Sequence, residues 1–206
     1  MRFKLQKLVH ALVLFSEKGV PDLTKLKAAK LLYFADKEHL LHYGRPILGD
    51  IYFCLPYGPV PSFALNEMGD AIEKSEVDDP DRTLFLKYLD IKKGFWNPYP
   101  IFKAKQKHDP DVFSQSELEV LDRVTQLYGN HSARQLVELT HSEPTWQIAN
   151  QERSPDGRAL IPYELFFVDA PEDARQMLEL FRAECQDASE LDAILNQKAR
   201  RPAVNV

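Results

Sequence analysis

The sequence predicts a mainly α-helical domain with a small β element, an α+β fold organised around one buried central helix. Three observations indicate this fold class. Apolar residues recur at intervals of three and four in several windows, two Ser-x-x-Glu/Gln capping boxes open helical windows, and windows rich in β-branched and aromatic residues are short. With 206 residues, the chain is long enough to bury a core of its own.

The first predicted helix runs from about Phe3 to Lys18 and ends before Gly19 and Pro21. A second helix follows after a short loop, so the two helices should pack antiparallel. Either Asp22 or Thr24 can cap the second helix, because a short oxygen-bearing side chain accepts a bond from a first-turn amide.

The second helix is predicted to be the centre of the fold, within an organising stretch from Leu26 to Ser62. It is apolar around most of its circumference, which is typical of a helix buried on most sides, and Gly44 supplies its left-handed stop. Its polar residues form only a narrow stripe: Lys27, Lys30, Lys37 and Glu38.

The segment Ile47–Leu55 is the first strand candidate, with a turn or bulge at Gly49 and Asp50. The following PYGPVP has three prolines, which restrict φ and lack an amide donor, so it is predicted to be a rigid corner that joins the strand to a helix ending near Lys74. The corner is either purely architectural or also a partner contact.

The middle of the chain, residues 75–111, contains a polar turn and then TLFLKYLDI, which is a strand or a helix. Pro98 and Pro100 indicate an edge strand or a loop, because proline cannot donate to a β-ladder. Trp96, Tyr99 and Phe102 either cover the core or form an exposed aromatic patch.

Two capping boxes, at Ser114 and at Ser132, each place a Glu or Gln three residues later and predict two further helices. A third helical piece follows Pro144. Beyond Asn150, we expect a short aromatic segment, a helix that has Pro171 in its first turn, and a last helix around Leu191–Leu195. This C-terminal part contacts a partner, forms a homo-oligomer, or simply packs on the domain.

The composition predicts a cytoplasmic protein with reduced thiols. Cys54 and Cys185 are far apart and lack metal-type spacing, no window has the length of a membrane span, and basic residues interrupt the N-terminal apolar run. Residues 1–110 hold 17 Lys+Arg and 14 Asp+Glu, whereas residues 111–206 hold 9 and 17. The acidic second half disfavours nucleic acid and suits a basic protein partner, or it is merely a solvated helix surface.

Catalytic and metal-binding patterns are weak. His39 and His42 are three residues apart on the central helix, but HLLH lacks the spacing and the glutamate of a zinc-protease motif. Asp36 on the same helix needs a donor if it is buried, and Arg45 or the backbone of the PYGP corner are the candidates. We therefore expect no cofactor, no metal and no enzyme activity, and a metal-dependent hydrolase is the least favoured alternative.

Three blocks, KLLYFAD, HYGRPILGD and PYGPVPS, occur in this order within about forty residues. In this combination they resemble the Panacea domain, the SocA-like family of antitoxins in bacterial and phage toxin–antitoxin operons. The resemblance extends more faintly to LTHSEPTW. It divides the chain into a Panacea-like domain, residues 1–150, and a C-terminal helical appendage, residues 151–206. The family motif falls on Tyr33, Asp36, Gly44, Arg45, Pro46, Gly49, Asp50, Gly58, His141 and Trp146.

The resemblance implies a non-enzymatic protein that neutralises a cognate toxin encoded nearby by binding it. It also allows an adaptor that delivers the toxin to a ClpXP-type protease. No pattern in the sequence identifies the contact residues, and we expect them in the corner, the middle aromatics and the acidic C-terminal helix. The residues concerned are Tyr57, Pro59, Trp96, Tyr99, Phe102, Glu172, Asp173 and Glu179.

Overall fold

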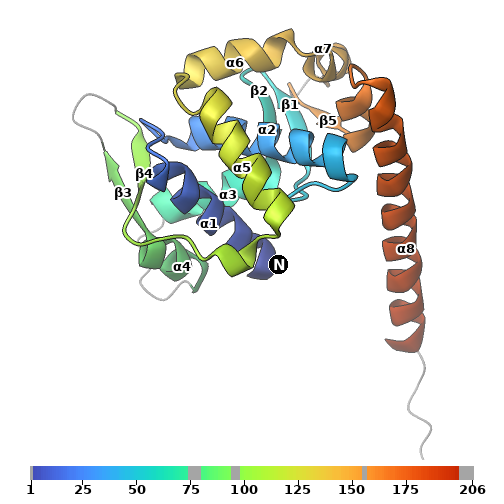
Figure 1. Cartoon of the computed structure of the whole chain (residues 1–206), viewed down its shortest axis with the longest axis horizontal. Coiled ribbons are helices and arrows are strands. Elements are labelled where there is room, and N and C mark those ends of the chain that lie inside the picture. The colour runs from blue at the N-terminus through green and yellow to red at the C-terminus, as the bar shows by residue number, and fades with distance from the viewer. Residues whose placement is uncertain (1, 74–79, 94–97, 155–156, 200–206) are drawn as a thin grey trace, which may run out of the picture.

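The computed structural model describes residues 2–73, 80–93, 98–154 and 157–199. Helices make up most of this part of the chain, and two small antiparallel sheets complete it (Figure 1). The central helix α2 (Lys25–Tyr43) is buried along most of its length, which confirms the predicted fold class. It contacts α3 (Ser62–Glu73), α5 (Gln115–Tyr128), α6 (Ala133–Ser142), α8 (Arg175–Ala199) and the strand β2 (Gly58–Pro61).

Both ends of α2 are capped by local chemistry. The Thr24 side chain, rather than that of Asp22, accepts the amide of Lys27 at 3.4 Å. Gly44 ends the helix in the left-handed conformation, with φ of +69°, and its amide donates to the Leu40 carbonyl. The preceding helix α1 (Arg2–Glu17) lies before a short turn, as the sequence predicts.

The narrow polar stripe of α2 is largely buried. The exposed fractions of Lys27, Lys30 and Lys37 are 2%, 0% and 7%. A lysine stem can pack against apolar groups while its ammonium reaches an oxygen, which makes such burial tolerable. The ammonium of Lys27 donates to the Pro21 carbonyl, that of Lys30 to the Pro59 carbonyl, and that of Lys37 lies near the carboxylates of Glu143 and Asp169.

The predicted strand and corner form a β-hairpin instead. The strand β1 (Tyr52–Leu55) starts five residues after Ile47, because Gly49 with φ of +62° turns the chain before it. PYGPVP supplies the hairpin turn and the whole of β2, so the corner prediction was wrong in part. A third strand, β5 (Ala159–Ile161), pairs with the other edge of β1.

The register explains how two prolines fit into β2. Pro59 pairs with Cys54 and Pro61 with Tyr52, whereas the Ser62 amide donates to the Ile51 carbonyl. Along an antiparallel strand, the backbone N–H and C=O groups of alternate residues point toward the partner strand and away from it. The nitrogens of both prolines therefore point away from β1, and no ladder hydrogen bond is lost. The prolines therefore occupy the outer edge of the sheet.

The middle of the chain contains both structures that the sequence allowed for TLFLKYLDI. The helix α4 (Pro80–Tyr88) runs directly into the strand β3 (Leu89–Lys93), which pairs with β4 (Pro100–Ala104). Phe102 donates its amide to the Leu23 carbonyl at 2.9 Å, so β4 is held against the loop before α2. The Phe102 ring is 2% exposed and packs 6.4 Å from that of Phe85.

Both predicted capping boxes are present. Ser114 opens α5, after a short 3-10 turn, η1 (Pro110–Val112), and Ser132 opens α6. The helix α7 (Pro144–Gln151) follows with its proline in the first turn. In both boxes the serine side chain accepts the third-residue amide while the Glu or Gln accepts the serine amide.

The C-terminal residues begin inside the core and end outside it. Phe166 in η2 (Tyr163–Phe167) is fully buried, with its ring 5.4 Å from that of Tyr33. After η3 (Glu172–Ala174), the chain forms one continuous helix, α8, which includes the separate last helix predicted at Leu191–Leu195. Within the described residues, no helix combines the length and the apolar content needed to cross a membrane.

Candidate functional site

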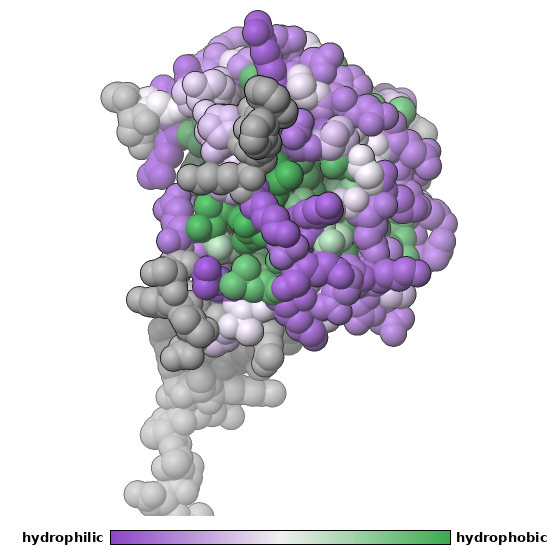
Figure 2. Space-filling model, turned by 90° about the vertical axis from the view of Figure 1, so that its left-hand side faces the viewer, coloured by the Kyte–Doolittle hydropathy of each residue, from purple (hydrophilic) through white to green (hydrophobic). Residues whose placement is uncertain are grey.

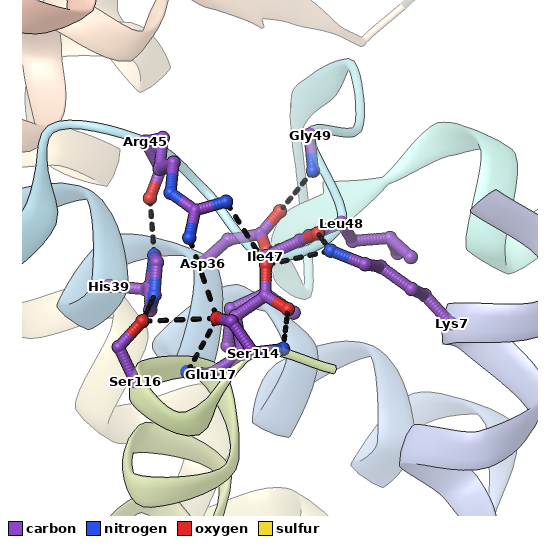
Figure 3. A network of polar contacts seen from close by, with 10 residues as sticks. All are labelled: Lys7, Asp36, His39, Arg45, Ile47, Leu48, Gly49, Ser114, Ser116 and Glu117. Atoms are coloured by element: carbon purple, nitrogen blue, oxygen red, sulfur yellow. Dashed lines mark hydrogen bonds and ion pairs between the residues drawn. The ribbon is translucent and has the colours of Figure 1, made fainter. Parts of the chain in front are cut away.

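Asp36 is a fully buried carboxylate with three donors. It accepts the amides of Leu48 and Gly49 at 2.7 and 3.2 Å (Figure 3). It also accepts the Tyr52 hydroxyl at 3.0 Å. Burial raises the pKa of Asp36 to about 6, and the donors from Leu48 and Tyr52 oppose that rise. Neither Arg45 nor the PYGP corner supplies these bonds, so both predicted donors were wrong.

Asp50 organises the start of the next helix. Its carboxylate accepts the amides of Phe63 and Ala64, both at 2.8 Å, at the start of α3. Its carbonyl accepts the Tyr163 hydroxyl at 2.8 Å, which ties η2 to the same loop. Gly49 lets the chain turn between the two aspartates, and a Cβ on it would lie 3.6 Å from the Pro46 ring. These motif residues therefore hold the backbone of one loop.

A third buried carboxylate, Glu117, joins α1, α5 and the loop after α2 (Figure 3). It accepts the Lys7 ammonium at 2.7 Å and the Ser114 amide at 2.9 Å, and an Arg45 nitrogen lies at 3.6 Å. His39 is also buried. Its Nδ1 lies 2.6 Å from the Arg45 carbonyl, which makes Nδ1 the donor and Nε2 the acceptor for Ser116.

The two histidines on α2 do not form a metal site. Both ring nitrogens of His39 are engaged in hydrogen bonds, and burial lowers its pKa, which favours the neutral ring. His42 is exposed, and its Nδ1 bonds to the Glu38 carbonyl of its own helix. In the part of the chain that the structure describes, no group of three or more His, Cys, Asp or Glu is arranged to hold a metal ion.

Gly58 gives Lys30 access to the edge of the sheet. It has φ of +94°, and a Cβ placed on it would lie 2.5 Å from the Lys30 ammonium nitrogen and 2.5 Å from the Thr140 hydroxyl oxygen. Without a side chain there, the ammonium reaches the outward-facing Pro59 carbonyl at 2.8 Å. Desolvation lowers the pKa of Lys30 to about 7. Gly58 is therefore required both by its positive φ and by the lack of room for a Cβ.

The remaining motif residues fasten α6 and α7 to the centre. The Tyr33 hydroxyl donates to the Glu143 carboxylate at 2.5 Å, between the two helices. The rings of His141 and Trp146 are stacked with centroids 4.0 Å apart, and the Trp146 indole donates to the Leu55 carbonyl at 3.2 Å. Like Asp36 and Asp50, the Tyr33 hydroxyl and the Trp146 indole find their hydrogen-bond partners within the protein, whereas the buried Nε2 of His141 has none.

One hollow of the surface is an apolar groove with a volume of about 1000 Å³. It lies where the start of α2, the β1–β2 hairpin, α3, the start of β4 and the first turn of α6 meet. Figure 2 shows this face, with hydrophobic residues in the hollow and hydrophilic residues around it. The apolar lining residues are Leu26, Leu55, Val60, Leu65 and Ile72, and the rim carries Tyr57 and Tyr99.

The rim tyrosines are unusually exposed for their size. The exposed fractions of Tyr57 and Tyr99 are 68% and 69%. Exposed aromatics beside an apolar hollow are a common feature of protein interfaces, because they bury a large area at little cost in conformational entropy. The arrangement suits the docking of apolar side chains.

The family model of the SocA-like antitoxin, Panacea domain, matches residues 29–147. The chain belongs to this antitoxin family. The match covers most of the buried framework from α2 to α7 and most of the segments that line the groove. Comparison with curated proteins and with solved structures gives no match.

The predicted contact residues differ in exposure and position in this antitoxin-family fold. Tyr57 and Tyr99 come together at the groove, whereas the Pro59 and Phe102 side chains are buried and offer no surface. Glu172, 2.7 Å from Arg175, and Glu179 are exposed on the C-terminal segment. Trp96 and the side chain of Asp173 lie outside the described residues.

The sequence did not indicate the apolar lining of the groove. Leu65 and Ile72 on α3 are both half-buried where they line the hollow. Leu26 was one apolar residue among many on α2. A tyrosine beside prolines, as at Tyr57 and Tyr99, was the only local signal, because the groove is assembled from five segments distant in sequence.

Proposed function

We propose that this protein is an antitoxin that neutralises a cognate protein toxin by direct contact, with toxin side chains seated in the apolar groove. Membership of the antitoxin family supports a toxin partner. The observation that carries the proposal is the groove itself, because it combines an apolar floor with the exposed Tyr57 and Tyr99. No group of the antitoxin changes covalently in this mechanism.

The rest of the motif is better suited to support than to recognition. Asp36, Asp50 and Glu117 are each at most 2% exposed and accept hydrogen bonds from the protein's own groups. A partner could reach them only by breaking those bonds. The groove has no such cost, and each leucine-sized toxin side chain buried there would contribute about 1.5–3 kcal/mol.

Co-expression with the product of the neighbouring open reading frame tests the proposal. The neighbour alone should arrest growth, and the unsubstituted antitoxin should restore growth and co-purify with it. The double variant Tyr57→Ala/Tyr99→Ala should bind at least about tenfold more weakly and lose protection, because it removes both rim aromatics. Leu127→Ala/Leu160→Ala is the matched control, since both leucines are 55% exposed and lie outside the groove lining.

The outcomes separate the candidate mechanisms. Full protection by the tyrosine variant, with a normal thermal transition, would exclude the groove as the toxin-binding surface. Protection without a stable complex, and only in a host that has the ClpXP protease, would favour the adaptor mechanism over direct neutralisation. A harmless neighbour would refute the antitoxin function for this pair of proteins.

A further inference from the structure

The helix α8 leaves the domain after its first turns (Figure 1). Its start is anchored, because Met177, Leu178 and Phe181 are half-buried and the Phe181 ring lies 5.3 Å from that of Tyr163. At the anchor the helix crosses α2 closely, and a Cβ on Gly44 would lie 3.0 Å from Leu180 Cβ. From Arg182 to Ser189 every side chain is exposed.

The part of α8 that follows its anchored turns is too long to be explained as a helix end. Residues 182–199 span about 27 Å at 1.5 Å per residue. Isolated helices shorter than about 12–15 residues are marginal in water, and helices in proteins draw most of their stability from packing an amphipathic face. The projecting segment thus has the length and form of an element that is covered by something outside this chain.

The sequence of the segment supplies an apolar stripe. Apolar residues continue from the anchored turn at intervals of three and four, which places them on one side of the helix. Phe181 begins this stripe at the edge of the core. The stripe continues through Cys185, Ala188, Leu191 and Leu195.

The charges of this segment indicate which kind of partner can cover it. Residues 183–197, hereafter the acidic arm, carry Glu184, Asp187, Glu190 and Asp192 and no Lys or Arg. Pairing two copies of the arm would place like charges against each other, which is unfavourable. A partner surface with basic residues beside an apolar strip is complementary to the arm.

We propose that the acidic arm is a second toxin-binding element, which binds a basic surface of the toxin that carries an apolar strip. This inference rests on the proposed antitoxin function. The groove and the arm then make separate contacts, one dominated by apolar burial and the other by charge. Their contributions should therefore differ in salt dependence.

The test measures the affinity of the full-length antitoxin for the purified product of the neighbouring open reading frame. The arm variant Glu184→Gln/Asp187→Asn/Glu190→Gln is compared with the charge-matched control Asp111→Asn/Glu119→Gln/Glu152→Gln, whose acids are exposed elsewhere. The arm variant should bind about tenfold more weakly at about 50 mM salt and about twofold at about 500 mM. The control should bind like the unsubstituted protein.

A second variant tests the stripe. Leu191→Gln/Leu195→Gln should weaken binding about fivefold at both salt concentrations, because loss of apolar contact is not screened by ions. Unchanged affinity of the arm variant, with the Tyr57/Tyr99 variant still defective, would overturn this inference alone. Absence of any complex with the unsubstituted protein would overturn the proposed function and this inference together. A dimer that tightens when the arm acids are neutralised would show self-association instead.

Discussion

The buried ammonium of Lys30 makes the stability of this fold depend on pH in a predictable direction. The pKa of Lys30 is lowered from 10.5 to about 7 by desolvation, and the side chain is fully buried. Between these two values the unfolded chain binds more protons than the folded chain, so stability must rise with pH. Over the interval from pH 7 to pH 9, this group should contribute an increase of about 2 kcal/mol in the free energy of unfolding.

The substitution Lys30→Met isolates that contribution. Methionine keeps a long apolar stem and removes the ammonium, at a cost of about 1–3 kcal/mol for leaving the Pro59 carbonyl unpaired. Urea unfolding at pH 6, 7, 8 and 9 should give a free energy that rises less steeply for the variant than for the unsubstituted protein. Lys103→Met, at an exposed position on β4, is the control and should keep the full slope. Equal slopes for Lys30→Met and the unsubstituted protein would refute the desolvation argument.

Two further predictions concern the C-terminal end of α2, at Gly44, and its middle, at Asp36. Gly44→Ala should destabilise the protein by about 2–4 kcal/mol and raise hydrogen exchange in α8. The alanine would have to adopt a positive φ, and its Cβ would collide with Leu180. Gly19→Ala has a similar φ and open space around it, so it should cost only about 1 kcal/mol and leave α8 protected; equal effects would contradict the steric reasoning. The pKa of Asp36 is raised from 3.8 to about 6, so between these values the folded state binds more protons than the unfolded state. Stability should therefore fall by about 2 kcal/mol as the pH rises from 3.8 to 6. Asp36→Asn should flatten that part of a pH series of urea transitions, and a persistent fall would assign it to another group.

The elements that could be predicted from the sequence are those determined by neighbouring residues. The capping boxes at Ser114 and Ser132, the Thr24 cap and the Gly44 stop all depend on side chains within four positions of the helix end. The family blocks likewise lie within a single stretch of chain. Local chemistry of this kind survives in the folded structure because nothing distant competes with it.

The features that sequence reasoning missed depend on partners far along the chain. A segment with two prolines becomes the strand β2 only because the register with β1 turns both nitrogens outward. The donors to Asp36 could not be chosen because backbone amides leave no mark in the sequence. The buried ammonium of Lys30 donates to the Pro59 carbonyl, which is 29 residues away in the sequence. The groove likewise brings together segments as distant as Leu26 and Ser132.

The proline edge of β2 limits the ways in which another chain can join this molecule. An exposed strand edge normally offers amides and carbonyls to any extended peptide, but here Pro59 and Pro61 have no N–H and the Pro59 carbonyl is occupied by Lys30. Strand addition is therefore blocked beside the groove, and a partner must be recognised by side-chain shape and charge. The same edge is thereby protected against edge-to-edge aggregation.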